Sequence, residues 1–179
     1  MTCAVLLSPS CLGCVNVGPT GPTGSAGVAP SYYFSVTLRS PTYYTLPATA
    51  TPIPFNTVLA TSADDSYDVS SSTYTVPASG NYRFEWQFGI NYQNGRLAGT
   101  NTSFILTVDT VPIAASFESL PQTSVGGGYN NAMSFYEGYF QAGSKVSLQG
   151  LNTSVTALVR VIAVALGEID NNFTCESLF

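Results

Sequence analysis

The chain has 179 residues and a formal net charge of −5, and only 8% of its residues are charged, against about 25% in ordinary soluble domains. It contains no histidine, which removes the commonest general base and most catalytic triads. Its five cations are scattered, whereas nucleic-acid binding needs clustered cations that neutralise phosphates. We therefore expect no enzyme, no cofactor, no catalytic or metal-binding residue and no nucleic-acid partner.

The low charge density favours either a polar, neutral surface or a surface largely covered by other copies of the chain. The longest apolar run, residues 157–166, contains Arg160 and is too short to span a membrane. Residues 1–12 have neither the basic start nor the apolar length of a secretory signal. We expect an extracellular surface protein that lacks a classical signal peptide and a membrane span, and that is released by another route such as cell lysis.

The amino-terminal residues 1–17 precede any clear fold and contain Cys3, Cys11 and Cys14, whereas Cys175 lies near the other end. A redox function for Cys11 and Cys14 would need a helix N-terminus that lowers a thiol pKa, and this proline-interrupted segment offers none. A zinc site would need all four cysteines, because histidine is absent. We favour structural disulfides over zinc, and free thiols are a third interpretation.

The next segment, G-P-T-G-P-T-G-S-A-G, has a glycine at every third position. Only glycine fits the crowded axis of a triple helix, so residues 18–29 are predicted to form a collagen-like stalk. So few triplets cannot hold three chains together alone, and without a trimeric neighbour the segment would be a Gly/Pro linker. The glycines in register are Gly18, Gly21, Gly24 and Gly27.

Short β-rich segments follow, separated by turn residues about every ten positions. The acidic residues Asp64, Asp65 and Asp68 do not have the spacing of a calcium-binding loop, and we expect a solvated loop there. The apolar run 157–167 is typical of a strand buried on both faces or at a three-fold axis. Strands are expected at 32–39, 82–91, 103–109, 111–118, 132–141, 145–151 and 157–167, and loops or turns at 40–54, 93–95, 124–131 and 142–144.

The stretch from Tyr67 to Trp86 has the strongest pattern. Aromatic residues alternate with polar ones from Tyr82 to Trp86, which is typical of a strand with one buried and one solvated face. We expect a turn at Gly80 and Asn81 that leads into this strand, because glycine accepts a positive φ.

The same stretch resembles the C1q/TNF-like jelly-roll family, in which two aromatic residues at this spacing precede G-x-Y-x-F-x-aromatic. Phe55 matches an earlier phenylalanine, whereas Thr61 and Tyr74 replace a usual Asn or Asp and a usual Phe. The resemblance implies an all-β jelly-roll sandwich that forms homotrimers, and an unrelated β-sandwich is the alternative. The family-motif residues, which we expect at the trimer core, are Tyr67, Tyr74, Gly80, Tyr82, Phe84 and Trp86.

A short collagen-like stalk before such a domain is similar to bacterial exosporium and spore-appendage proteins. That resemblance implies a spore-surface location, and Thr20 and Thr23 as candidate O-glycan sites. The expected organisation is a connector at 1–17, the stalk at 18–29, the jelly roll at 30–169 and a carboxyl-terminal docking tail at 170–179.

Two functions from different classes remain open. In the first, the chain is a structural subunit of a surface fibre, pilus or endospore appendage, whose trimers join head to tail through residues 1–17. The four cysteines are then available for cross-links, and an anchor protein on the spore or cell surface is a candidate partner. In the second, it is a stalked trimeric binding module, adhesin- or lectin-like, whose loops 40–54 and 124–131 recognise a ligand.

Overall fold

A computed structural model of the chain describes residues 31–39, 44–62, 67–93, 101–119, 128–152, 158–161 and 171–178, and none of these residues is helical. The strands are β1 (Tyr33–Thr37), β2 (Tyr44–Thr45), β3 (Thr51–Pro52), β4 (Thr57–Thr61), β5 (Tyr67–Asp68), β6 (Thr73–Thr75), β7 (Gly80–Gln93), β8 (Asn101–Val108), β9 (Val111–Ser119), β10 (Gly128–Phe140), β11 (Lys145–Asn152), β12 (Leu158–Val161) and β13 (Asn172–Leu178).

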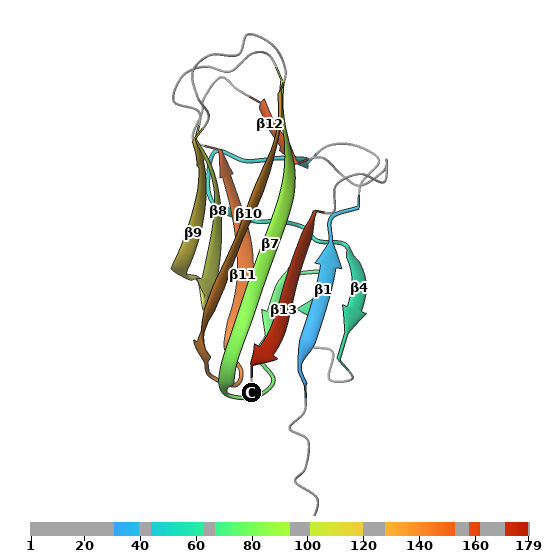
Figure 1. Cartoon of the computed structure of the whole chain (residues 1–179), viewed down its shortest axis with the longest axis vertical. Helices are drawn as coiled ribbons and strands as arrows, with labels where there is room; N and C mark the ends of the chain where they lie inside the picture. The colour runs from blue at the N-terminus through green and yellow to red at the C-terminus, as the bar shows by residue number, and fades with distance from the viewer. Residues whose placement is uncertain are drawn as a thin grey trace, which may run out of the picture.

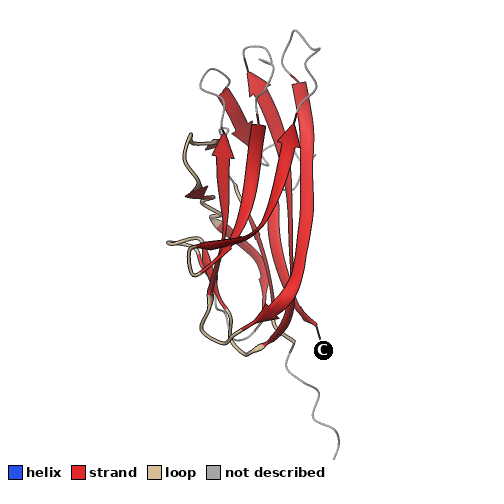
Figure 2. Cartoon of the chain, turned by 90° about the vertical axis from the view of Figure 1, so that its left-hand side faces the viewer, coloured by secondary structure: helices blue, strands red, loops and turns tan. Residues whose placement is uncertain are grey.

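The strands form two sheets that pack face to face (Figures 1 and 2). Sheet A has the order β2-β12-β7-β13-β1-β4, with β10 on the other edge of β7, and sheet B has the order β5-β6-β11-β8-β9, with β3 paired to β11. All the described pairings are antiparallel. The predicted all-β two-sheet sandwich is confirmed.

The long strand β7 is the centre of sheet A. Its inward row, which the sequence alternation predicted, is fully buried between the sheets, whereas Arg83 and Glu85 point to the other side. The expected turn at Gly80 and Asn81 is wrong, because Gly80 already pairs with Phe140 of β10 and the turn lies before it at residues 77–79. The buried row consists of Tyr82, Phe84, Trp86, Phe88 and Ile90.

Among the described residues, positive φ values occur in three hairpin turns, the first at Ser72 between β5 and β6, with φ 52°. Gly143, at φ 85°, lies in the predicted turn between β10 and β11, where glycine has no Cβ to strain. Asp109 and Thr110, at φ 49° and 72°, form the two-residue turn between β8 and β9, whose twist suits antiparallel strands. The Asp109 carboxylate accepts a hydrogen bond from the Lys145 amide at 2.9 Å, which ties this turn to the start of β11.

Several other segments differ from the sequence prediction. The expected loop 40–54 contains the short strands β2 and β3, and Gln93 of the expected turn 93–95 is the last residue of β7. Strand β10 begins at Gly128, so part of the expected loop 124–131 belongs to a strand. In the expected strand 157–167, residues 158–161 form β12, which pairs with β7 and β2, and residues 162–167 lie outside the described part of the chain.

The carboxyl-terminal segment is a central strand rather than a docking tail. Strand β13 pairs with β1 on one side and with β7 on the other, so the proposed boundary at 169 and 170 does not separate it from the sandwich. Its side chains alternate with period two, and Phe173 and Cys175 are buried in the core. The Tyr32 amide donates to Ser177 Oγ, and the Ser177 amide donates to the Tyr32 carbonyl, which fastens the end of β13 to the start of β1.

Phe173 joins the aromatic core across three strands. Its ring centroid lies 5.1 Å from that of Phe34 on β1, 5.7 Å from Phe55 and 5.9 Å from Phe84 on β7. Aromatic pairs at such distances add to the free energy gained from burying their area.

Cys175 lies on the same inward row, opposite Phe34 and Phe84 in the strand register. Its thiol is free and buried, and burial raises its pKa above the usual range. This position does not suit the predicted cross-link between subunits, because a thiol in the core is neither exposed nor ionised.

Replacing Phe173 by Ala should lower the free energy of unfolding by about 3–5 kcal/mol, because it leaves a cavity among three aromatic rings. Leu59→Ala is the matched control on edge strand β4, where the side chain is about half exposed, and it should cost below about 1 kcal/mol. Chemical denaturation measures both variants, and equal losses would contradict the central position of β13.

In a variant that retains only Cys175, with Ser at the other three cysteine positions, maleimide labelling of the folded protein should be at least about 100-fold slower than in denaturant. Because the raised pKa keeps the folded thiol protonated, raising the pH from about 7 to about 8 should hardly change the native rate, whereas the denatured rate should rise several-fold. Rapid native labelling would show that the thiol is accessible.

Candidate functional site: the outer face of sheet A

The family-motif aromatics lie in the core of a single chain. Tyr67, Tyr74, Tyr82, Phe84 and Trp86 are all buried between the two sheets. The expectation that they form the core of a trimer is therefore wrong, because no second copy can reach them in the folded domain.

The polar groups of these aromatic residues serve the fold. Trp86 Nε1 donates to Ser116 Oγ at 2.9 Å and so links sheet A to sheet B. Tyr82 Oη donates to the Ala78 carbonyl at 2.7 Å, and burial raises the pKa of this phenol. Burial also raises the pKa of Tyr67. Raised phenol pKa values keep these groups neutral, which suits a core and offers no general base.

The remaining predicted site residues are in the amino-terminal segment. They lie outside the described residues, so their predictions stay as they were made: Cys3, Cys11 and Cys14 as disulfide candidates, and Gly18, Gly21, Gly24 and Gly27 as the collagen-like repeat.

The most exposed apolar side chains of sheet A form a row on β10. Met133, Phe135 and Tyr139 have 75%, 58% and 66% of their surface exposed, whereas Ala132 and Phe140 on the opposite side of the strand are buried. We call Met133, Phe135 and Tyr139 the β10 row. Single exposed apolar residues are ordinary, but an aligned row on one face is typical of a contact surface.

The sequence of β10 differs from that of β7 in a way that indicates the β10 row. On β10, apolar residues occupy both parities, with Met133 and Phe135 on one and Tyr136 and Phe140 on the other. A strand that is apolar on both sides predicts two covered faces. Among the residues that the structure describes, only the inner face of β10 is covered.

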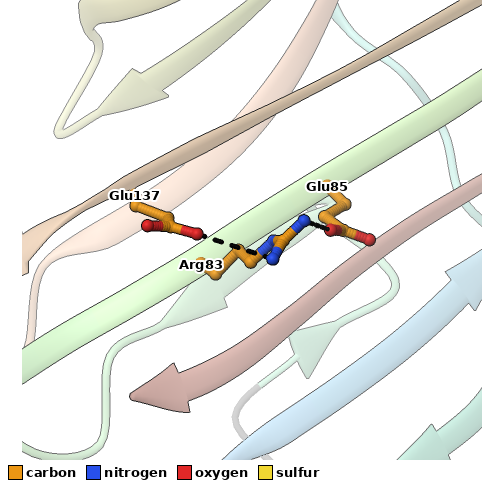
Figure 3. Close-up of polar contacts among 3 residues, drawn as sticks. All are labelled: Arg83, Glu85 and Glu137. Carbon is orange, nitrogen blue, oxygen red and sulfur yellow. Dashed lines mark ion pairs between the residues drawn. The ribbon is translucent and has the colours of Figure 1, made fainter.

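A charged cluster lies beside the β10 row. The Arg83 guanidinium makes ion pairs with Glu85 on its own strand and with Glu137 on β10, the latter at 3.5 Å (Figure 3). Arg83 also lies over the Phe135 ring, with 4.9 Å from its central carbon to the ring centroid, so it covers one side of an exposed aromatic. These charges are half-exposed, so each ion pair alone adds little to folding stability.

The face is hollowed between β10, β7 and β13. A groove of about 490 Å³ runs along Arg83, Gln87, Met133, Phe135 and Asn172. A second hollow of about 310 Å³ adjoins it toward Tyr33 on β1 and shares the Arg83 and Glu85 side chains. Apolar walls with a few polar groups suit the burial of another apolar surface or of a flat ligand.

In the described part of the chain, no group of three or more His, Cys, Asp or Glu could hold a metal ion. No helix long and apolar enough to cross a membrane occurs in the described residues.

No family model and no curated protein sequence matches this chain. Solved structures, in contrast, match this chain. The structure of Eiger TNF from S. frugiperda aligns with a TM-score of 0.60 at 12% identity, over 84% of this chain and 94% of that one. Murine APRIL at pH 5.0 aligns with a TM-score of 0.55 at 8% identity, over 83% of this chain and 99% of that one. At such low identity these alignments establish the fold alone, and the chain is a two-sheet sandwich with a TNF-like jelly-roll fold.

Proposed function

We propose that the chain is a structural subunit of a surface fibre or spore appendage, which forms homotrimers through the outer face of sheet A. The β10 row is the observation that carries this proposal, because three large apolar side chains stay exposed beside a groove on an otherwise well-packed sandwich. The TNF-like fold supports it, since the trimers expected from the family resemblance need a covered face. The low charge of the chain supports it as well.

The amino-terminal segments complete the proposal. The collagen-like glycines would align three chains below the domain, and residues 1–17 would dock onto the next trimer, so that a head-to-tail contact repeats into a fibre. Three such connectors per trimer bind together and gain avidity. Cys3, Cys11 and Cys14 remain candidates for cross-links along the fibre.

A second function is favoured by the position of the chain ends. Strand β1 starts and β13 finishes at the same end of the sandwich (Figure 1), where Tyr32 and Ser177 are hydrogen-bonded. A stalk attached there would present the opposite end of the domain, as in a stalked adhesin- or lectin-like binding module. In that case changes in loops 40–54 or 124–131 should abolish ligand binding and leave assembly intact.

Changing the β10 row to serine (Met133→Ser, Phe135→Ser, Tyr139→Ser) should turn trimers into folded monomers. Each truncated anchor of a protein interface typically costs about 2 kcal/mol of association free energy or more. The matched control changes two exposed apolar residues outside sheet A to serine, Val69 in the turn after β5 and Val111 on β9. Light scattering coupled to size exclusion gives the mass, and circular dichroism checks the fold. Trimers that survive the β10 changes would contradict this face as the contact.

The fibre is tested by negative-stain microscopy of the full chain beside a chain that begins at Gly18, each with and without reductant. We expect fibres from the full chain and isolated trimers from the shortened one, because only the former has the connector. Loss of fibres in reductant would assign the cysteines to cross-links. Identical isolated particles from both chains would refute the connector and favour the binding module.

A further inference from the structure

The outer face of sheet A has a local excess of negative charge around Arg83 of β7. The strand neighbours of Arg83 are Glu137 of β10 and Glu176 of β13, directly opposite it in the register, whereas Arg160 of β12 pairs with Asn91 near the other end of β7. Glu85 lies two residues along β7 on the same side. One guanidinium therefore faces three carboxylates, a net charge of −2 for each copy.

Glu176 is the surplus carboxylate. Arg83 is engaged by Glu85 and Glu137, whereas Glu176 is exposed and makes no ion pair with any described residue. Its neighbour on β1 is Tyr33, which is not a cationic residue. The other outward residues around the cluster, Gln87, Asn172 and Thr174, are uncharged. Among the described residues next to Glu176, Arg83 is thus the one cation, and it is already paired with Glu85 and Glu137.

A closed ring of three copies that meet through this face turns three such clusters toward one axis. Like charges repel more strongly as water leaves the space between them, because the effective dielectric constant falls. At physiological salt, charges are screened over about 8 Å, which is less than the width of a few strands, so only neighbouring clusters repel strongly. The β10 row favours the contact and the carboxylates oppose it.

We propose that the carboxylates around Arg83, and Glu176 above all, set the strength of self-association, so that the contact tightens at high salt and loosens at low salt. This inference rests on the proposed self-association through the same face. High salt screens the repulsion between the carboxylates of neighbouring copies, whereas at low salt this repulsion acts over a longer distance.

The experiment compares the trimer dissociation constant of the full chain by analytical ultracentrifugation at low salt and at about 1 M NaCl, at one pH of about 8. The test variant is Glu176→Gln, which keeps size and hydrogen-bonding capacity and removes the charge. The control is Glu118→Gln, which makes the same charge change on β9 of the other sheet. Arg83→Gln is the opposite variant, because it leaves three carboxylates without their cation.

At low salt, Glu176→Gln should tighten the trimer by roughly threefold or more and flatten its dependence on salt. Glu118→Gln should leave both the dissociation constant and its salt dependence unchanged, and Arg83→Gln should weaken the trimer and steepen the salt dependence. Weaker trimers from Glu176→Gln would overturn the inference, since Glu176 would then meet a cation of the neighbouring copy. Wild-type trimers indifferent to salt would overturn this inference alone. A chain that stays monomeric under every condition would overturn the proposed self-association as well.

Discussion

The structure depends on the packing of aromatic rings between the inward rows of β7, β13 and β1. Phe84, Phe173 and Phe34 come from three adjacent strands of sheet A and meet within about 6 Å of one another. These contacts place the last strand of the chain between the first and the central strand. The fold is therefore complete only when β13 has entered sheet A. The pairing of β13 with β1 and with β7 joins residues that are distant in the sequence.

The sequence predicted those parts of the fold in which one parity is apolar and the other polar. On β7 the alternation from Tyr82 to Trp86 identified the buried row correctly, and the turn at 142–144 followed from its glycine. Strand β13 was missed because its row is short and holds only Phe173 and Cys175, so its apolar residues resembled a tail that docks on another surface. Burial depends on the partner strand, which local pattern does not specify.

The candidate site was harder to predict than the fold, for a related reason. The family-motif aromatics form the clearest pattern in the sequence, and they are buried in the core of one chain. The residues available to a second copy, Met133 and Phe135, lie on β10, where apolar side chains on both parities hide which face is inward. Only the strand register with β7 distinguishes the inward from the outward residues of β10, and it places Arg83 beside the outward ones.

The hydrogen bonds between Tyr32 and Ser177 have a mechanical consequence. The chain enters β1 at the end of the sandwich where β13 finishes, and β1 is paired on both edges, with β13 and with β4. A tensile force applied to residues before Tyr33 acts along the axis of β1. It loads the hydrogen bonds of both neighbouring strands together, in shear, instead of peeling them apart one after another. A domain connected in this way withstands a pull along β1 through the backbone hydrogen bonds of two neighbouring strands at once.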